Sequence, residues 1–478
     1  MTQSPAGRTS PNPIRKHGPV VAVCVGGALT SLDLTIVNVA LPQLAGDLAA
    51  GLSGLQWVVN AYTLAFASLI LTAGALSDRL GDRPVFGSGV ALFTFASAGC
   101  GLAPSAEALI AARAVQGIGA AAILATSISL LARSYEGPRR AATIGAWVTV
   151  GTLAANLGPL VGGVLVDSLG WRGIFLVNVP IGLALLLALR VLVPGAAEPG
   201  RTDGAAPGRD RRPDIGGVAL AVTGLFALNF AVLSGSERGW WDPAVVGASV
   251  VAVLGLAGFV LLQRARGERA MFDLRLFRIP SFSAAVVLSL LTRMASFGAL
   301  PFFVLWMQGS LGLSATATGL CLLALSLPVL VLASLSGRLQ RVLSARVLIA
   351  SGNLAGAAGA LALLFGIDPD SGWAAALPGF ALIGAGAGLV FPSLMGIAVG
   401  VVTPDRAGMA SGMANTFFPL GTAVGVAVFG VVSTAAPDAE DAVVAGLDAI
   451  SASMAALCAL GVLVALTLIR NSDRAGPA

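Results

Sequence analysis

The sequence predicts an all-α integral membrane protein, built from two bundles of six helices and two inserted helices, with about 14 transmembrane helices in all. Of its 478 residues, 56% are hydrophobic and only 11% are charged, whereas soluble proteins carry about a quarter charged residues. Apolar runs of about 20 residues, enough to cross a bilayer, recur along nearly the whole chain. Because lipid offers no partners to backbone polar groups, these runs are expected to be helices.

The distribution of positive charge predicts the topology. Nearly all of the 28 lysines and arginines lie in alternate connections between the apolar runs, whereas the opposite connections hold only Arg172 and Arg238. Positive residues near span ends are retained on the cytoplasmic side. This asymmetry predicts a multi-pass protein of the cell membrane. It has an even number of spans, and both termini lie in the cytoplasm.

A weak internal repeat predicts the domain organisation. Residues 337–346 resemble residues 74–83 and occupy the matching place late in the chain, as expected of two parallel repeats. The inserted pair is either a lateral filler or a part of the transport machinery. The predicted segments are a tail (1–17), an N-terminal bundle (18–194), a linker (195–214), the inserted pair (215–263), a cytoplasmic loop (264–280), a C-terminal bundle (281–470) and a tail (471–478).

Two opposite charges are predicted at one depth of the membrane. Asp33 lies about 20 Å above the start of the first run, and Arg113 lies about 10 Å inside the fourth run from the opposite surface, at 1.5 Å per residue. If these helices are neighbours, each charge offsets the desolvation cost of the other. The pair is either a proton-coupling site, which opens when Asp33 takes a proton, or a static ion pair that fixes helix register.

Further polar side chains within the runs are candidates for the wall of a substrate cavity. Gln116 shares a helical face with Arg113. Arg293 has no obvious acidic partner in its own half, so it meets an anionic group of a substrate, bonds a backbone carbonyl or serves the structure alone. Aromatic residues are commonly interfacial anchors, but two of them stand beside polar residues that could border a pocket. These pairs are Trp57 with Asn60 and Trp306 with Gln308.

Several other functions are disfavoured by what the sequence contains. The net charge of +5 comes from residues scattered between apolar runs, so we expect no nucleic-acid partner. The four cysteines show no paired spacing, which argues against disulfides or a metal site. The single histidine, His17, lies in the tail, and no phosphate-binding loop is present. We expect no enzymatic activity, no metal and no cofactor. The protein is expected to be a monomer that uses a proton gradient as its energy source.

Several stretches, in order along the chain, resemble the Major Facilitator Superfamily, and closely its fourteen-span drug:proton antiporter branch, over almost the whole length. The resemblance is carried by Leu32–Pro42, Gly74–Arg83, Arg113–Gly119, Gly158–Gly163 and Trp171–Pro180, and more loosely by Phe391-Pro392 and Asp405–Gly412. The later half departs from the family pattern at Arg293, where relatives are generally apolar, and at Phe417-Phe418, which replaces a commonly polar pair.

The resemblance implies roles for particular residues. The loop that controls opening and closing is implied to include Gly74, Asp78, Arg79, Gly81 and Arg83. An antiporter motif, in which small residues let helices approach closely and a proline bends the helix, is implied at Gly158, Pro159, Gly162 and Gly163.

The expected function is proton-coupled export of small hydrophobic or amphiphilic organic compounds, such as antibiotics, by alternating access. The alternatives are a narrow-specificity metabolite exporter or importer of the same fold and, more remotely, a membrane-embedded sensor or enzyme.

Overall fold

The computed structural model of the chain is all-helical in the part that it describes, which is residues 13–135, 137–192, 214–267, 270, 273–402, 407–434 and 441–469. Thirteen stretches of these residues are long and apolar enough to cross a membrane. Helix α3, with 29 residues, is not one of these thirteen but packs against them. The described residues therefore contain fourteen long helices, the number predicted. Most of the predicted segments 1–17 and 195–214, and all of 471–478, lie outside the described residues.

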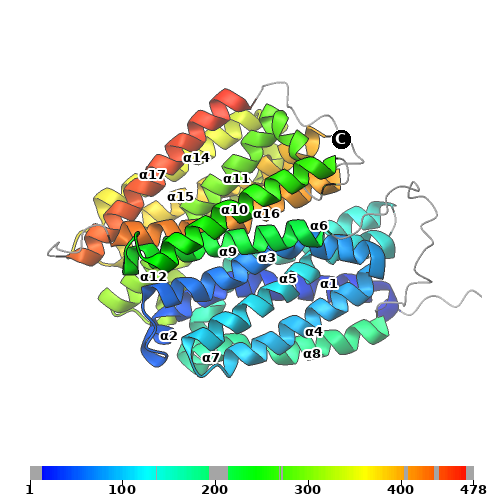
Figure 1. Ribbon diagram of the computed structural model, residues 1–478, viewed down its shortest axis with the longest axis horizontal. Coiled ribbons are helices and arrows are strands. Elements are labelled where there is room, and N and C mark those ends of the chain that lie inside the picture. The colour runs from blue at the N-terminus through cyan, green and yellow to red at the C-terminus, as the bar shows by residue number, and fades with distance from the viewer. Residues whose placement is uncertain are drawn as a thin grey trace, which may run out of the picture.

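The first group of helices packs as one bundle, drawn in blue and cyan in Figure 1. Its long helices pack chiefly through the pairs α3–α5, α4–α5 and α1–α6. The elements are α1 (Pro13–Ile36), η1 (Val37–Ala40), α2 (Leu41–Asp47), α3 (Leu52–Leu80), α4 (Asp82–Gly101), α5 (Ala106–Ser134), α6 (Gly137–Leu169), α7 (Trp171–Leu176) and α8 (Asn178–Leu192). We call this group the N-half.

The last group of helices packs as a second bundle, drawn in light green to red in Figure 1. Its main contacts are between α14 and α15, α13 and α15, and α14 and α17. The elements are η3 (Leu274–Arg278), α11 (Pro280–Phe297), α12 (Leu300–Leu305), η4 (Trp306–Ser310), α13 (Ala315–Leu339), α14 (Ala345–Gly366), η5 (Trp373–Ala376), α15 (Leu377–Gly400), α16 (Ala407–Ser433) and α17 (Ala442–Leu468). We call this group the C-half.

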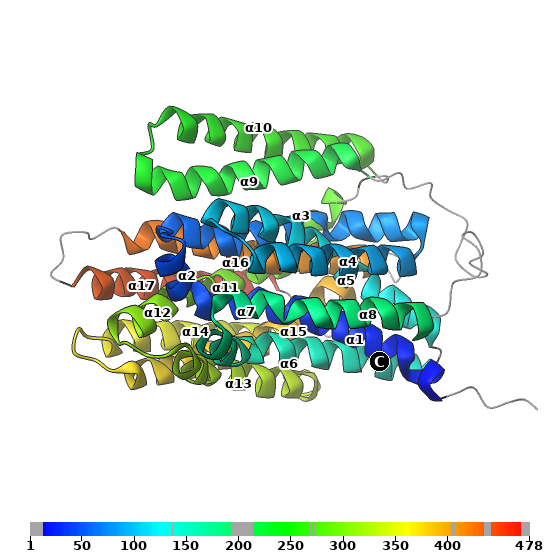
Figure 2. The same cartoon turned by 90° about the horizontal axis from the view of Figure 1, so that it is seen from below.

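The inserted pair, α9 (Ile215–Arg238) and α10 (Pro243–Arg266), lies along one edge of the molecule (Figure 2). Helix α9 packs on both α3 of the N-half and α16 of the C-half, whereas α10 packs on α9. The side chain of Asp214 begins α9 by accepting a hydrogen bond from the backbone N–H of Gly217 (2.6 Å), the usual way in which a helix N-terminus is satisfied. The inserted pair therefore spans the boundary between the halves.

The two ends of the molecule differ in how closely the halves approach. We call the end at which α1 begins the inner end, and the opposite end, which carries α2 and α12, the outer end (Figure 2). At the outer end one hydrophobic core is shared, because Ala315 and Val426 of the C-half pack among Ile36, Val37 and Leu55 of the N-half. The outer end is therefore closed in this structure.

Candidate transport site

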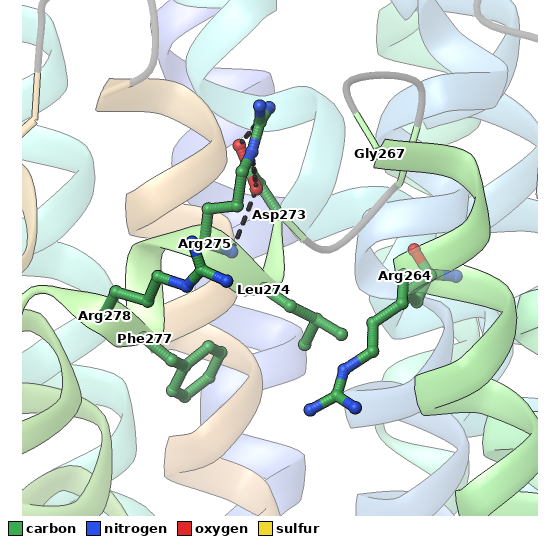
Figure 3. A pocket seen from close by; sticks show the side chains of 8 residues that line it. Arg264, Gly267, Asp273, Leu274, Arg275, Phe277 and Arg278 are labelled. Atoms are coloured by element: carbon green, nitrogen blue, oxygen red, sulfur yellow. Dashed lines mark hydrogen bonds and ion pairs between the residues drawn. The ribbon is translucent and has the colours of Figure 1, made fainter.

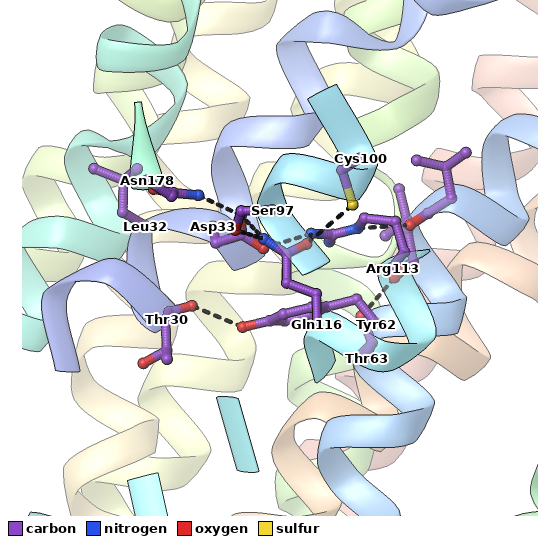
Figure 4. A network of polar contacts seen from close by, with 12 residues as sticks. Thr30, Leu32, Asp33, Tyr62, Thr63, Ser97, Cys100, Arg113, Gln116 and Asn178 are labelled. Atoms are coloured by element: carbon purple, nitrogen blue, oxygen red, sulfur yellow. Dashed lines mark hydrogen bonds and ion pairs between the residues drawn. The ribbon is translucent and has the colours of Figure 1, made fainter. Parts of the chain in front are cut away.

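A polar network surrounds Asp33 inside the N-half, between α1, α4, α5 and α8 (Figure 4). Nη1 of Arg113 forms an ion pair and hydrogen bond with Oδ2 of Asp33, as the shared depth of the two residues predicts. Both side chains are almost fully buried, at 1% and 0% exposure. The pair lies where its charges are compensated by each other and not by water.

Three further side chains complete the hydrogen bonds of the pair. Gln116 donates to Oδ1 of Asp33 (2.9 Å) and accepts from Nη1 of Arg113 (2.7 Å), so it bonds both charges at once. Gln116 also donates to the hydroxyl of Ser97 (2.8 Å), and Asn178 donates to Oδ1 of Asp33 (3.2 Å). The Asp33 carboxylate therefore accepts bonds from Gln116 of α5 and Asn178 of α8, which are 62 residues apart in the sequence (178 − 116).

The guanidinium of Arg113 is enclosed by aromatic rings and backbone. Its carbon lies 4.3 Å from the centre of the Tyr62 ring and 5.7 Å from that of Phe175, while Nε donates to the carbonyl oxygen of Val58 (3.1 Å). Aromatic faces attract a cation in a dry environment. Arg113 would thus keep several stabilising contacts if Asp33 lost its charge.

Residues that sequence reasoning did not single out also belong to this network. Tyr62, Ser97 and Asn178 each lie on a different helix and contact Asp33, Gln116 or Arg113. Asn178 was part of a stretch that carries the family resemblance, and that was the only signal of its importance. Its Oδ1 atom is buried without a hydrogen-bond partner among the described residues, so the network contains one unused hydrogen-bond acceptor.

Hydrogen bonds between the halves gather at the outer end. Gln56 donates to the carbonyl of Val426 (2.9 Å), and Gln308 donates to the carbonyl of Val39 (3.0 Å). Gln308 is presented by η4, a wide π-helical turn of a kind that is common at functional sites. Its neighbour Trp306 is buried in the C-half core. The predicted pair Trp306 and Gln308 therefore helps to close the outer end.

The predicted antiporter motif lies on α6 where this helix crosses α1 and α13. A Cβ atom added at Gly162 would lie 2.7 Å from side-chain carbons of Ile36 and Val39, and one added at Gly163 would lie 2.7 Å from the backbone carbonyl carbon of Ala315. Gly158 likewise faces Thr35 of α1, and the carbonyl of Pro159 faces Gly319 of α13. The small residues thus permit close approach of the helices, as the sequence predicts.

Asp167 forms a state-specific contact that the sequence did not predict. From the end of α6 it accepts hydrogen bonds from the backbone N–H groups of Ala315 (3.2 Å) and Thr316 (2.8 Å), at the positive N-terminus of α13. Since α6 and α13 belong to different halves, this contact helps to hold the outer end closed.

We expect Asp167→Ala to shift the equilibrium away from the closed outer end by about 1 kcal/mol, roughly a fivefold change in population. Helix α13 itself should persist, because Ser314 caps it independently through Ala317. Spin labels at exposed Leu80 and Val342, in a variant without the native cysteines, report the opening of the inner end. Ser168→Ala is the matched control because, in the described part of the chain, the Ser168 hydroxyl bonds only carbonyls of its own helix, those of Val164 and Leu165. An unchanged distance distribution in Asp167→Ala would contradict the expected shift.

The predicted gating loop lies at the inner end, where α3 turns into α4. Gly81 has a φ of +90°, a conformation that favours glycine, and Arg83 donates to the carbonyl of Leu189 at the end of α8 (3.0 Å). The carboxylate of Asp82 pairs with Nε of Arg133 (2.9 Å), and this ion pair joins the start of α4 to the end of α5. Gly74 and Arg79 belong to α3, and the side chain of Asp78 lies outside what the structure describes. The contacts described here hold the loop to the N-half.

A small pocket of about 10 Å³, room for roughly one water molecule, lies between the halves beside the Asp33 network. It contains Arg293, and its wall includes residues of both halves and none of the other predicted cavity candidates. The lining residues are Leu34, Thr35, Asn38, Val59, Arg293, Phe297, Leu300, Thr422 and Val426.

Trp57 and Asn60, which the sequence suggested as pocket residues, instead contact the inserted helix α9. Trp57 stacks on Phe226, with ring centres 6.2 Å apart, and Asn60 donates to Oδ1 of Asn229 (3.0 Å). Asn60 also donates to the carbonyl of Ala423 in α16 (3.2 Å). Both side chains face α9, whose position the sequence could not predict. They join α3 to α9, Asn60 also joins α3 to α16, and neither residue lines the Arg293 pocket.

A larger and more open pocket lies at the inner end, between the end of α10 and η3 (Figure 3). Arg275 is held by a bidentate contact with Asp273 (3.0 and 3.1 Å). The lining residues are Gln263, Arg264, Gly267, Asp273, Leu274, Arg275, Phe277 and Arg278. This pocket is far along the helices from Asp33 and gathers part of the basic charge expected in the predicted loop 264–280.

Comparison with known proteins agrees with the fold. The family model described as Major Facilitator Superfamily matches residues 23–291 and 285–478. Among solved structures, a bacterial homologue of the human lysosomal transporter Spinster, crystallised inward-facing and unoccupied, superposes with a TM-score of 0.66 at 18% identity, over 98% of this chain and 100% of that one.

Several curated relatives are similar over most of their length. Multidrug resistance protein Stp of Mycobacterium tuberculosis (strain ATCC 25618 / H37Rv) is 37% identical over 87% of this chain and 75% of its own. Cephamycin export protein CmcT of Amycolatopsis lactamdurans is 37% identical over 89% and 86%, and Methylenomycin A resistance protein of Bacillus subtilis (strain 168) is 33% identical over 86% and 86%. With these matches and its helical architecture, the chain belongs to the Major Facilitator Superfamily and is a multi-pass membrane transporter.

Proposed function

We propose that this transporter is a proton-coupled antiporter that exports small hydrophobic or amphiphilic organic compounds, antibiotics among them, by alternating access. The observation that carries the proposal is the buried Asp33–Arg113 pair beside a pocket shared by both halves. Leu34 and Thr35, the two residues after Asp33, line that pocket. A change at Asp33 is thus transmitted along α1 to the pocket wall within one helical turn.

The proposed cycle follows from the electrostatics of the pair. A bare carboxylate in a dry site is costly unless a cation compensates it, and protonation removes that cost. When a proton neutralises Asp33, the attraction to Arg113 weakens and Gln116 and Asn178 are free to change partners. When the proton leaves, the ion pair forms again and restores the packing of α1 on α5. Binding of a proton and binding of cargo would then favour different arrangements of the halves.

The orientation that we propose places both termini in the cytoplasm of a cell membrane, in line with the distribution of arginine. The inner end then faces the cytoplasm, and in the proposed cycle cargo is loaded from that side while the outer end is closed. The proton gradient supplies the energy, no further cofactor takes part, and a monomer suffices because both halves of the pocket come from one chain. The printed names of the relatives, which concern resistance to or export of antibiotics, support the substrate class.

A susceptibility panel tests this function. The chain is expressed in an efflux-deficient bacterial host, and growth is measured against chemically varied antibiotics with and without a protonophore. We expect raised resistance to several amphiphilic compounds, lost when the protonophore collapses the gradient. Resistance that survives the protonophore would overturn proton coupling. Increased sensitivity to a compound would indicate import, and protection against one compound alone would indicate a narrow-specificity exporter.

A further inference from the structure

The pocket between the halves contains a cation without a counterion. Arg293 of α11 takes part in no ion pair or hydrogen bond within the described residues, and its Nε atom is buried without a partner. Arg113, the other arginine inside a span, by contrast has an acidic partner, an amide and a carbonyl. A buried charge without a partner is costly, so its retention calls for a compensating group that comes from outside the chain.

Arg293 is held in place by aromatic rings and not by hydrogen bonds. Its guanidinium carbon lies 4.1 Å from the ring centre of Phe297 and 5.2 Å from that of Phe391, and Phe391 packs edge-on against Phe418 (5.3 Å). Ring faces attract the cation but leave its N–H groups free. Part of the side-chain surface stays open because it borders the pocket. The N–H donors of Arg293 are therefore oriented but unused.

Two other polar groups of the pocket are also without partners. Oδ1 of Asn38, from the N-half, and Oγ1 of Thr422, from α16, are buried and make no hydrogen bond to any residue that the structure describes. The amide nitrogen of Asn38 is already used by the carbonyl of Thr35 (3.1 Å), so Asn38 offers only an acceptor. The hydroxyl of Thr422 offers a donor as well as an acceptor. Thr35 is the other polar residue of the wall, and its hydroxyl already bonds the carbonyls of Leu32 (3.2 Å) and Ala155 (2.9 Å). The rest of the wall is apolar and consists of the side chains of Leu34, Val59, Phe297, Leu300 and Val426.

We propose that this transporter binds organic anions, with the negative group of the cargo on Arg293 in the pocket between the halves. The planar guanidinium is suited to a carboxylate or a similar two-oxygen anion, which it can bind through two parallel hydrogen bonds. The pocket holds only about 10 Å³ in this arrangement, so cargo enters as the halves move apart around it. Thr422 then donates to the same group, Asn38 accepts from a neighbouring hydroxyl or amide of the cargo, and the apolar side chains of the wall contact its aromatic or aliphatic body. The inference rests on the proposed function and names its substrate class as amphiphilic organic acids.

Binding to the purified protein in detergent, without any gradient, tests the inference apart from transport. Matched compounds are compared on three scaffolds (naphthalene, biphenyl and anthracene), each as the carboxylate, the carboxamide and the aminomethyl derivative. We expect the carboxylate of at least one scaffold to bind at least about tenfold more tightly than its amide, with the amine the weakest. Arg293→Gln should abolish that preference and leave the amide affinity unchanged, while Arg293→Lys should keep part of it. Arg238→Gln, an exposed residue at the end of α9, is the matched control.

The binding and resistance measurements together separate the anion site from the proposed export. If no carboxylate is preferred over its amide on any scaffold, or if the preference survives in Arg293→Gln, the inference is wrong. If the preference depends on Arg293 but no antibiotic resistance is conferred, then the proposed export fails and the anion site stands. If resistance is conferred without an Arg293-dependent preference, export stands and the anion site fails.

The same residue yields a stability prediction that separates binding from a structural role. Arg293→Met removes an uncompensated buried charge and keeps apolar contact with Phe297 and Phe391, so the unliganded variant should unfold at a temperature several degrees higher than the parent. A residue that serves only to fix α11 would give a lower unfolding temperature. Thermal unfolding in detergent, followed by intrinsic tryptophan fluorescence, measures the difference.

Discussion

Replacing Asp33 by asparagine is expected to abolish proton-driven efflux while substrate exchange without a gradient continues. Asparagine keeps the size of the side chain and, like the protonated acid, offers both a donor and an acceptor, but it cannot bind or release a proton at physiological pH. The pocket that contains Arg293 is formed by other residues, so cargo binding should survive. Efflux driven by an imposed pH gradient in proteoliposomes, compared with counterflow of a labelled substrate at equal pH, measures the two activities separately.

A second variant keeps this test decisive if Asp33→Asn folds poorly. The single substitution leaves Arg113 buried without its counterion, which costs about 3–5 kcal/mol when one partner of a buried pair is removed. The double variant Asp33→Asn with Arg113→Gln makes the pair neutral and should restore folding. A static ion pair predicts that the double variant transports normally, whereas a proton-coupling pair predicts that it folds, exchanges substrate and cannot use the gradient. Gradient-driven efflux by the double variant would rule out the coupling role.

The depth of each charged residue could be predicted from the sequence, because a helix rises by a fixed 1.5 Å per residue. That rule placed Asp33 and Arg113 at one level, and the structure has them in contact. The rule does not say which helices are neighbours or which way each face points. Asn178 therefore went unrecognised, although it donates to Asp33, because its distance in the chain gives no clue to the packing of α8 on α1.

The same limitation explains the candidates that the structure places elsewhere. Trp57 lies near Asn60 in the sequence, and Gln308 lies near Trp306. An aromatic residue next to a polar one fits a contact between helices as well as it fits a pocket wall. The first faces α9, whose position beside α3 follows from tertiary packing alone. The second is turned toward Val39 by the wide turn η4, which changes the helical phase locally. Arg293 was recognisable because a charge within an apolar run is informative whatever its orientation.

Replacing Gly163 by valine is expected to drive the transporter out of the arrangement seen here. A Cβ atom at this position would lie 2.7 Å from the carbonyl carbon of Ala315 and 2.8 Å from Cα of Thr316. These are backbone atoms of α13, so no side-chain rotation can relieve the overlap, and α6 and α13 must separate at the outer end. The halves rock as packed units, so opening of the outer end should close the inner end and reduce transport strongly.

The separation is measurable with the spin labels at Leu80 and Val342, which lie at the inner ends of the two halves. In Gly163→Val the distance between the labels should shorten relative to the parent, and efflux should fall. Gly145→Val is the matched control on the same helix, because a Cβ atom at Gly145 meets nothing within 4 Å. An identical distance distribution and normal efflux in Gly163→Val would show that close approach of α6 and α13 is not needed to close the outer end. If only Gly163→Val shifts the distance, the glycine of the antiporter motif acts by setting how near the two halves can come.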